Sequence, residues 1–195
     1  MDNERQLILA SSSINRRALL DRLMLPYKAV SPDIDETPRR GESPTDLVSR
    51  LSKEKALSQV SVFKDALIIG SDQVAVLEGQ ITGKPHTYEN AFRFLQQARG
   101  KCIHFLTGLC VTDSESNQTL EGIETYKVYY KQYTDLQIEH YLEKEQPFAC
   151  AGSLKSEGLG IALLDKIEGN DPSALIGLPL IKLTTILQQF NFPVL

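Results

Sequence analysis

Three observations predict an α/β fold with a mixed sheet. Short apolar runs of strand length alternate along the chain with longer stretches of helix-forming residues. The dipeptide Glu78-Gly79 interrupts one strand pattern and predicts a hairpin, which an all-parallel sheet would not contain. The 195 residues show no internal repeat and no low-complexity linker. We therefore expect one domain over residues 1–195.

The first strand and helix are expected close to the N-terminus. The apolar run RQLILA predicts a buried strand, and Ser13 is suited to cap a helix over residues 13–25. Ser43-Pro44 predicts the start of another helix, because serine caps helices and proline fits their first position.

The rest of the chain continues the alternation of strands and helices. An apolar strand at 67–70 is expected to continue through Ser71-Asp72-Gln73 into residues 74–77. The other expected elements are a helix over 87–99, strands over 101–112 and 121–132, and helices over 134–145 and 174–190.

Composition and charge exclude several classes of function. Apolar residues make up 42% of the chain and charged residues 24%, as in ordinary globular proteins. No apolar run reaches the ~18 residues of a membrane span, and the N-terminus lacks the order of a signal peptide. The net charge is −4 and the basic residues are dispersed, so nucleic acid is not an expected partner. We expect a soluble, cytoplasmic protein that binds a small ligand and contacts no membrane.

Cysteines and histidines give no indication of a metal site. Cys102, Cys110 and Cys150 have no C-x-x-C spacing, which favours reduced thiols over disulfides or bound zinc. The three histidines are equally scattered and form no H-E-x-x-H motif.

A serine- and arginine-rich segment follows the first predicted strand. Ser11 precedes the expected helix, and Arg16 and Arg17 fall in its first turn, where cations oppose the helix dipole. An anion bound at this helix N-terminus would reverse that penalty. The alternative is a pair of solvated arginines.

Two further segments carry charged residues that could belong to a binding site: an acidic loop and the face of a predicted helix. The loop over residues 33–38 contains Glu36 and offers the hard oxygen ligands that Mg²⁺ or Mn²⁺ prefers, although such loops are often only solvated. Lys55 shares the apolar face of its predicted helix with Leu51. It therefore either snorkels past that face or points its charge into a site.

Asp72 is the strongest candidate for a catalytic group. It interrupts an apolar strand, where a carboxylate is costly unless it turns the chain, pairs, binds metal or catalyses. We interpret it as a general base that activates water, with an Asx turn as the alternative. Lys84 follows Gly83 in a turn that lacks the spacing of a P-loop.

The segment from Gly152 to Gly160 is rich in glycine. Its three glycines would allow close backbone approach to a ligand, and Lys155 and Glu157 are expected to alternate along an extended stretch. A flexible surface loop is the alternative. Together these segments supply the bases and acids that a metal-bound triphosphate requires.

The motifs S-S-S-x-x-R-R, D-E-T-P, K-x-K-A, G-S-D-Q, G-K-P, K-S-E-G and G-L-P occur in this order. In this order they resemble the Maf pyrophosphatases, over residues 7–187. The resemblance implies two α/β lobes around a cleft, as in inosine triphosphate pyrophosphatases. It also implies hydrolysis of a nucleoside triphosphate to the monophosphate and pyrophosphate with a divalent metal cation, Mg²⁺ or Mn²⁺, and a homodimer.

The resemblance also implies roles for individual residues. Asp72 would accept the proton, and Glu36 would help to hold the metal or to position the water. The phosphate-binding set would be Ser11, Arg16, Arg17, Lys55 and Lys84. Base selection would fall to Asn15, Gln73 and Glu157.

The likeness is strongest to the bacterial branch that hydrolyses 7-methyl-GTP, because Gln73 follows Asp72 and Glu157 occupies the later loop. Asn15 departs from the aromatic residue common in that branch and cannot stack on a cationic base. Two alternatives stay open: a dTTP and UTP pyrophosphatase of the same family, and a nucleotide-binding inhibitor of septum formation without turnover.

Overall fold

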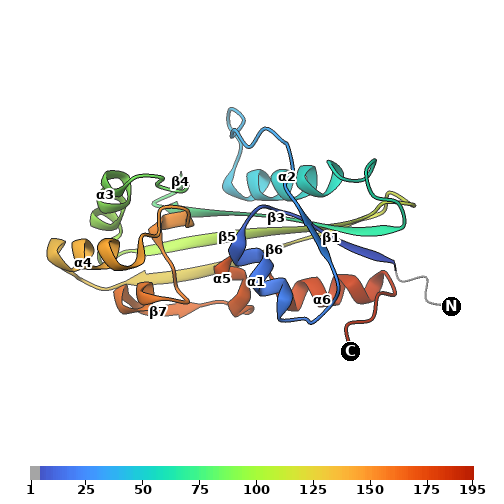
Figure 1. Cartoon of the computed structure of the whole chain (residues 1–195). Coiled ribbons are helices and arrows are strands. Elements are labelled where there is room, and N and C mark those ends of the chain that lie inside the picture. Colours follow the sequence, from blue (N-terminus) through green and yellow to red (C-terminus); the bar gives the residue numbers. More distant parts are fainter. Residues whose placement is uncertain (1–4) are drawn as a thin grey trace. The chain divides into compact units, whose positions relative to one another are not determined.

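A computed structural model describes residues 5–195 (Figure 1). Its strands are β1 Gln6–Ala10, β2 Lys28–Val30, β3 Ala66–Leu77, β4 Gln80–Thr82, β5 Cys102–Asp113, β6 Thr119–Tyr130 and β7 Leu164–Glu168. Its α-helices are α1 Ile14–Asp21, α2 Pro44–Leu57, α3 Tyr88–Ala98, α4 Asp135–Glu145, α5 Pro172–Ile176 and α6 Leu180–Gln189. Two short 3₁₀ helices are η1 Ala151–Ser153 and η2 Leu159–Leu163.

Among these described residues the strands form one mixed sheet. Its order is β2-β1-β3-β5-β6-β7, and β4 pairs with β3. Strand β1 runs parallel to β2 and β3, whereas β4 and β7 run antiparallel to β3 and β6. Glu78 and Gly79 both adopt positive φ, 50° and 81°, as a two-residue hairpin turn requires. The predicted α/β class, mixed sheet and hairpin are confirmed.

The chain divides into two compact units, and each is described by itself. Unit 1 comprises the described residues up to Asp72 together with Thr107–Glu124 and Asp171–Leu195. Unit 2 comprises Gln73–Leu106 and Thr125–Asn170. Strands β3, β5 and β6 each contain a boundary between the units.

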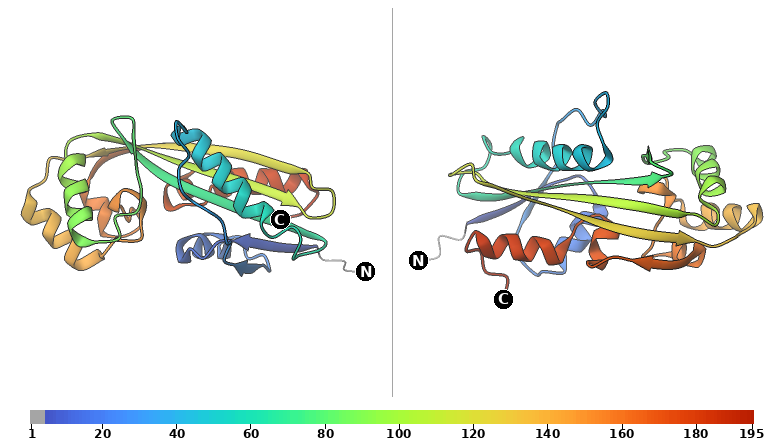
Figure 2. Two further views of the ribbon diagram at one scale, coloured as in Figure 1. Left: turned by 90° about the horizontal axis from the view of Figure 1, so that it is seen from above. Right: turned by 180° about the vertical axis from the view of Figure 1, so that it is seen from behind.

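Helices cover both faces of the sheet in unit 1, with α2 on one face and α1 and α6 on the other (Figures 1 and 2). The alternation along β1 explains this arrangement. Leu7 and Leu9 belong to the apolar cluster that contains residues of α1 and α6. Ile8 and Ala10 belong to the cluster that contains Ala56 of α2.

Two glycines let α2 lie directly on the sheet. A Cβ at Gly70 of β3 would lie 2.0 Å from the carbonyl oxygen of Ser52, and a Cβ at Gly108 of β5 would lie 2.4 Å from that of Val48. Any side chain at either position would push the helix away. This contact brings the buried face of α2, including Lys55, down onto β3.

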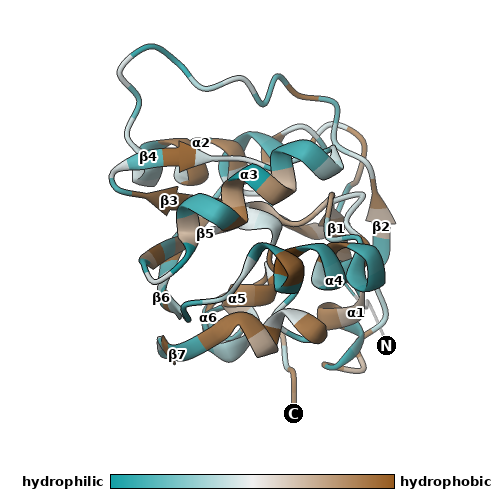
Figure 3. Ribbon diagram, turned by 90° about the vertical axis from the view of Figure 1, so that its left-hand side faces the viewer, coloured by the Kyte–Doolittle hydropathy of each residue, from teal (hydrophilic) through white to brown (hydrophobic). Residues whose placement is uncertain are grey.

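Unit 2 has its own helical layer, formed by α3 and α4, which each carry a hydrophilic and a hydrophobic face (Figure 3). Helix α3 buries Phe94 and Leu95, and α4 buries Tyr141 and Leu142. The hydroxyl of Tyr133 donates to the carbonyl oxygen of Leu95 at 2.8 Å and so ties the start of α4 to α3.

Two predicted helices are shorter than expected. The helix predicted over 13–25 ends at Asp21. The single helix predicted over 174–190 is wrong, because α5 and α6 are separated at Gly177, whose φ is +127°. Asp171 joins the two, since its carboxylate accepts from the backbone N–H groups of Ser173 and Ile181.

No helix in residues 5–195 has the length and apolar character that crossing a membrane requires.

Candidate active site

Lys55 lies at the centre of a charged cluster in unit 1. The residue is only 4% exposed, and its Nζ donates to Asp72 Oδ1 at 2.6 Å. Nζ also pairs with Glu36 Oε1 at 2.9 Å. Helix α2 supplies the lysine, β3 the aspartate and the preceding loop the glutamate. Lys55 thus points its charge into the unit, and the snorkelling alternative is excluded.

Arg16 extends this cluster from helix α1. Its Nε donates to the carbonyl oxygen of Gly177 at 2.8 Å. Burial lowers the pKa of Arg16, while the nearby charges of Asp72 and Glu36 raise it. Ser71 Oγ lies 3.1 Å from the same Gly177 oxygen. An arginine, a lysine and two carboxylates therefore gather at one place in unit 1.

The serine segment forms the predicted helix cap. Ser13 Oγ accepts from the backbone N–H of Arg16 at 3.4 Å, which confirms Ser13 as the N-cap of α1. Ser11 Oγ accepts from the backbone N–H of Ser13 at 3.1 Å. Asn15 is half-buried and Arg17 exposed on the same first turn of α1.

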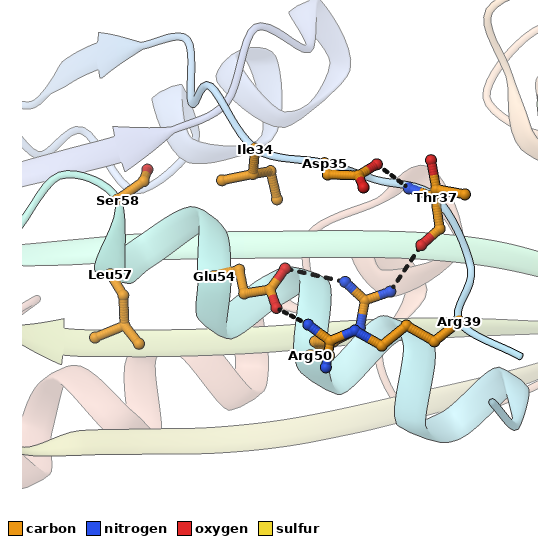
Figure 4. A pocket seen from close by; sticks show the side chains of 8 residues that line it. All are labelled: Ile34, Asp35, Thr37, Arg39, Arg50, Glu54, Leu57 and Ser58. Carbon is orange, nitrogen blue, oxygen red and sulfur yellow. Dashed lines mark hydrogen bonds and ion pairs between the residues drawn. The ribbon is translucent and has the colours of Figure 1, made fainter.

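The loop that carries Glu36 is fastened to α2. Arg50 binds both carboxylate oxygens of Glu42, at 2.6 and 2.9 Å, and donates to the carbonyl oxygen of Thr37 at 3.1 Å. Arg39 and Arg50 both converge on Glu54 (Figure 4). Beside these contacts lies a cavity of about 560 Å³, and among the described residues that line it are none of those predicted to bind substrate.

Three predicted residues belong to unit 2. Gln73 is half-buried and directly follows Asp72, whereas Lys84 and Glu157 are exposed. Lys84 and Glu157 share Cys150 as a neighbour. Burial raises the pKa of that thiol most, the charge of Glu157 raises it further and the charge of Lys84 lowers it.

The expectation of an extended segment at Lys155 and Glu157 is wrong. These residues lie in a turn between η1 and η2. Tyr141 of α4 imposes the turn, because its hydroxyl donates to the carbonyl oxygen of Ser153 at 2.9 Å and accepts from the backbone N–H of Lys155 at 3.1 Å. A Cβ at Gly158 would lie 2.5 Å from the carboxylate of Glu145, so this glycine lies close to the end of that side chain.

The family follows from comparison with known proteins. A model of the family described as Maf-like protein matches residues 6–190. The chain belongs to the Maf family. Among its relatives, a protein of Colwellia psychrerythraea named 7-methyl-GTP pyrophosphatase is 51% identical over 97% of this chain and 94% of the relative. Proteins with the same name from Nitrosococcus oceani and Vibrio vulnificus are each 50% identical over 97% of this chain, covering 95% and 97% of the relative.

The carboxylates of this Maf protein fit a metal that is held jointly with substrate. No group of three or more His, Cys, Asp or Glu side chains in the described part of the chain is arranged to bind a metal. Asp72 and Glu36 nevertheless converge within 3 Å of one ammonium group. Because Mg²⁺ commonly takes one or two carboxylates and completes its shell with phosphates and water, this donor set is sufficient.

Sequence reasoning missed how the Maf motifs are joined in space. Ser71 and Gly177 were recognised only as parts of G-S-D-Q and G-L-P, yet Gly177 accepts from Arg16, 161 positions away in the chain. Arg50 was not singled out at all. Its position in α2, four residues before Glu54, is a signal for an ion pair but not for loop attachment.

Proposed function

We propose that this chain is a nucleoside triphosphate pyrophosphatase that hydrolyses 7-methyl-GTP to 7-methyl-GMP and pyrophosphate. Relatives that share half of its residues over nearly their whole length carry the name 7-methyl-GTP pyrophosphatase. The structural observation that carries the reaction is the buried Lys55, which holds the carboxylates of Asp72 and Glu36.

The reaction needs a water molecule activated for attack on the α-phosphorus. Asp72 takes the proton from this water, the new P–O bond forms at the α-phosphorus, and the bond to the bridging oxygen breaks. Pyrophosphate leaves with the β- and γ-phosphorus atoms. Lys55 holds the carboxylate of Asp72 in place through the hydrogen bond from its Nζ.

Cationic groups neutralise the triphosphate during this step. The proposed phosphate-binding set is Ser11, Arg16, Arg17, Lys55 and Lys84. A divalent cation, Mg²⁺ or Mn²⁺, would be held by Glu36 and would neutralise negative charge on the phosphates. The cluster around Lys55 and Arg16 supports this assignment.

Base selection is assigned to three residues. Glu157 is exposed, and a carboxylate suits a methylated guanine that is cationic and offers N–H donors. Gln73 can read base edges through its amide group. Asn15 lies on the first turn of α1 and offers an amide where an aromatic ring would stack.

We propose the cytoplasm as the setting and a homodimer as the assembly. In residues 5–195 all three cysteines are free thiols, which suits a reducing compartment. The dimer rests on the family resemblance, and light scattering after size-exclusion chromatography measures it.

The test is pyrophosphate release from 7-methyl-GTP, GTP, dTTP, UTP, CTP and ATP with Mg²⁺ or Mn²⁺. The expected result is dominant turnover of 7-methyl-GTP, which depends on Asp72. A preference for dTTP or UTP would support the proposed reaction but contradict 7-methyl-GTP as the preferred substrate. If no nucleotide releases pyrophosphate, the proposed enzymatic activity is contradicted. A nucleotide-binding inhibitor of septum formation would then be favoured.

A further inference from the structure

Glu145 is the last residue of α4. Its carboxylate makes two hydrogen bonds to the segment that carries Glu157, one before Glu157 and one after it. One carboxylate oxygen accepts from the Nζ of Lys155 at 2.5 Å, and the other accepts from the backbone N–H of Leu159 at 2.6 Å. The Glu145 side chain is only 13% exposed although it lies at a helix end. Gly158 packs directly against this carboxylate. Glu145 therefore holds one residue on each side of Glu157 in the sequence, Lys155 and Leu159.

Lys155 faces two carboxylates within unit 2. The hydrogen bond and charge of Glu145 raise the pKa of Lys155 most, and the charge of Glu157 raises it further. The same hydrogen bonds from Lys155 and Leu159 lower the pKa of Glu145. Lys155 thus lies close enough to Glu157 to be attracted by it, but it is hydrogen-bonded to Glu145.

The two carboxylates compete for one ammonium group. If Lys155 paired with Glu157, the ammonium would neutralise that carboxylate and occupy its acceptor oxygens. In the structure the ammonium is bound by Glu145, which also anchors the turn at Leu159. The exposed Glu157 is then left available to a ligand.

We propose that Glu145 is a positioning residue for base selection, which holds Lys155 so that the Glu157 carboxylate is free to bind a cationic purine. This inference rests on the proposed function, because it takes Glu157 as the residue that reads the base. It adds a residue from α4 to the determinants of specificity and explains why a lysine is tolerated next to the selecting carboxylate.

The experiment measures kcat and KM for 7-methyl-GTP and GTP in four proteins. These are the wild type, Glu145→Gln, the double variant Glu145→Gln/Lys155→Gln, and the control Glu143→Gln. Glu143 is an exposed acid on the same helix, so its replacement removes the same charge without touching the turn. Thermal unfolding of each protein reports whether the fold is retained.

Glu145→Gln is expected to lower the preference for 7-methyl-GTP over GTP by about tenfold, the loss of one charge-assisted interaction. The change should appear in the KM for 7-methyl-GTP, with GTP turnover and Glu143→Gln at wild-type levels. The double variant should recover most of the preference, because no ammonium remains to mask Glu157. An unchanged preference in Glu145→Gln, or no recovery in the double variant, would overturn the proposal.

A second measurement separates this proposal from the proposed function. NMR titration of the Lys155 ammonium needs no substrate. In Glu145→Gln its pKa is expected to stay raised through pairing with Glu157, and to return to its ordinary value in Glu145→Gln/Glu157→Gln. Return to the ordinary value in the single variant would refute the competition. A wild type without preference for 7-methyl-GTP would instead refute the proposed function.

Discussion

At the scale of single residues, the environment of Lys55 explains how a strand can carry a buried aspartate. A carboxylate inside a strand is costly without a partner, and Lys55 supplies that partner at 2.6 Å. Each charge stabilises the other, because burying the ammonium of Lys55 without a partner would also cost free energy. A second carboxylate, Glu36, reaches the same ammonium from a solvent-facing loop and is half-exposed. The charge cluster is therefore open to solvent on the side of Glu36.

Replacement of the proposed base tests the chemistry directly. Asp72→Asn keeps an oxygen that can accept from Lys55 but cannot take a proton from water. We expect kcat for 7-methyl-GTP to fall by at least ~100-fold, the usual contribution of a general base. Steady-state kinetics measures this, and circular dichroism checks the fold. The matched change Asp165→Asn, at an exposed aspartate, should leave kcat intact. Equal activity in Asp72→Asn and wild type would disprove the assignment.

Glu157 tests base selection separately from catalysis. Glu157→Ala is expected to weaken hydrolysis of 7-methyl-GTP by roughly tenfold relative to GTP, because it removes one charge-assisted contact to the cationic base. Competition assays with both nucleotides in one mixture give this ratio. If both substrates lose activity equally, Glu157 has no selective role.

Single residues differ in how far their surroundings could be predicted. Helical periodicity placed Lys55 on the apolar face of α2 but left open whether its charge snorkels past that face or points into a site. The contact between Arg16 and Gly177 could not be predicted, because it depends on how distant segments fold together. Periodicity describes one element at a time and contains no information about such contacts.

At the scale of elements, the site depends on how closely α2 approaches the sheet. Gly70→Ala would place a Cβ against the backbone of α2 at Ser52, where neither atom can easily move. We expect a loss of about 1–3 kcal/mol in the free energy of unfolding, as for other overpacked cores, together with lower turnover as Lys55 shifts. Urea denaturation measures the stability. Gly83→Ala, which meets open space, should unfold like the wild type. Similar stability of the two variants would show that α2 can move without cost.

The attachment of the Glu36 loop to α2 should depend on pH. Hydrogen bonds from Arg50 and from the backbone of Arg39 lower the pKa of Glu42 to about 2, from an ordinary 4.5. Because the folded value is the lower one, this interaction stabilises the protein fully above the ordinary value and is lost as the pH falls toward 2.

The stability difference between wild type and Glu42→Gln should therefore be largest at neutral pH and shrink as the solution is acidified below the ordinary value. Urea denaturation at several pH values measures this difference for both proteins. A difference that does not change with pH would mean that Glu42 is not held as an ion pair.

Elements were predicted best where the signal is local. The hairpin at Glu78-Gly79 and the cap at Ser13 depend on neighbouring residues alone, and both are confirmed. Gly177-Leu178-Pro179 was expected to introduce the last helix, but the separate short helix α5 before it was not predicted. The turn around Glu157 was missed because Tyr141 and Glu145, on another element, impose it.

At the scale of the whole molecule, the order of motifs predicted more than any single motif. The family match over residues 6–190 confirms the resemblance, and the mixed α/β sheet confirms the fold class. The candidate residues are divided between both units, with Asp72 in unit 1 and Gln73, the next residue, in unit 2.

Binding of the nucleotide should raise the stability of the protein. A ligand that binds only the folded state at 100 times its Kd adds about 2.7 kcal/mol to the free energy of unfolding. For a protein of this length that corresponds to a rise in Tm of roughly 5–10 °C. Asp72→Asn is the protein to use, because it should bind 7-methyl-GTP without consuming it. Differential scanning fluorimetry with Mg²⁺ and increasing nucleotide measures the shift.

The comparison between nucleotides makes this measurement decisive. GTP, which lacks the cationic base, should give a smaller rise at the same concentration, and the gap should close in Asp72→Asn/Glu157→Ala. An equal rise with both nucleotides would contradict the role of Glu157 in base selection. No rise with either nucleotide would contradict the proposed binding of a nucleoside triphosphate.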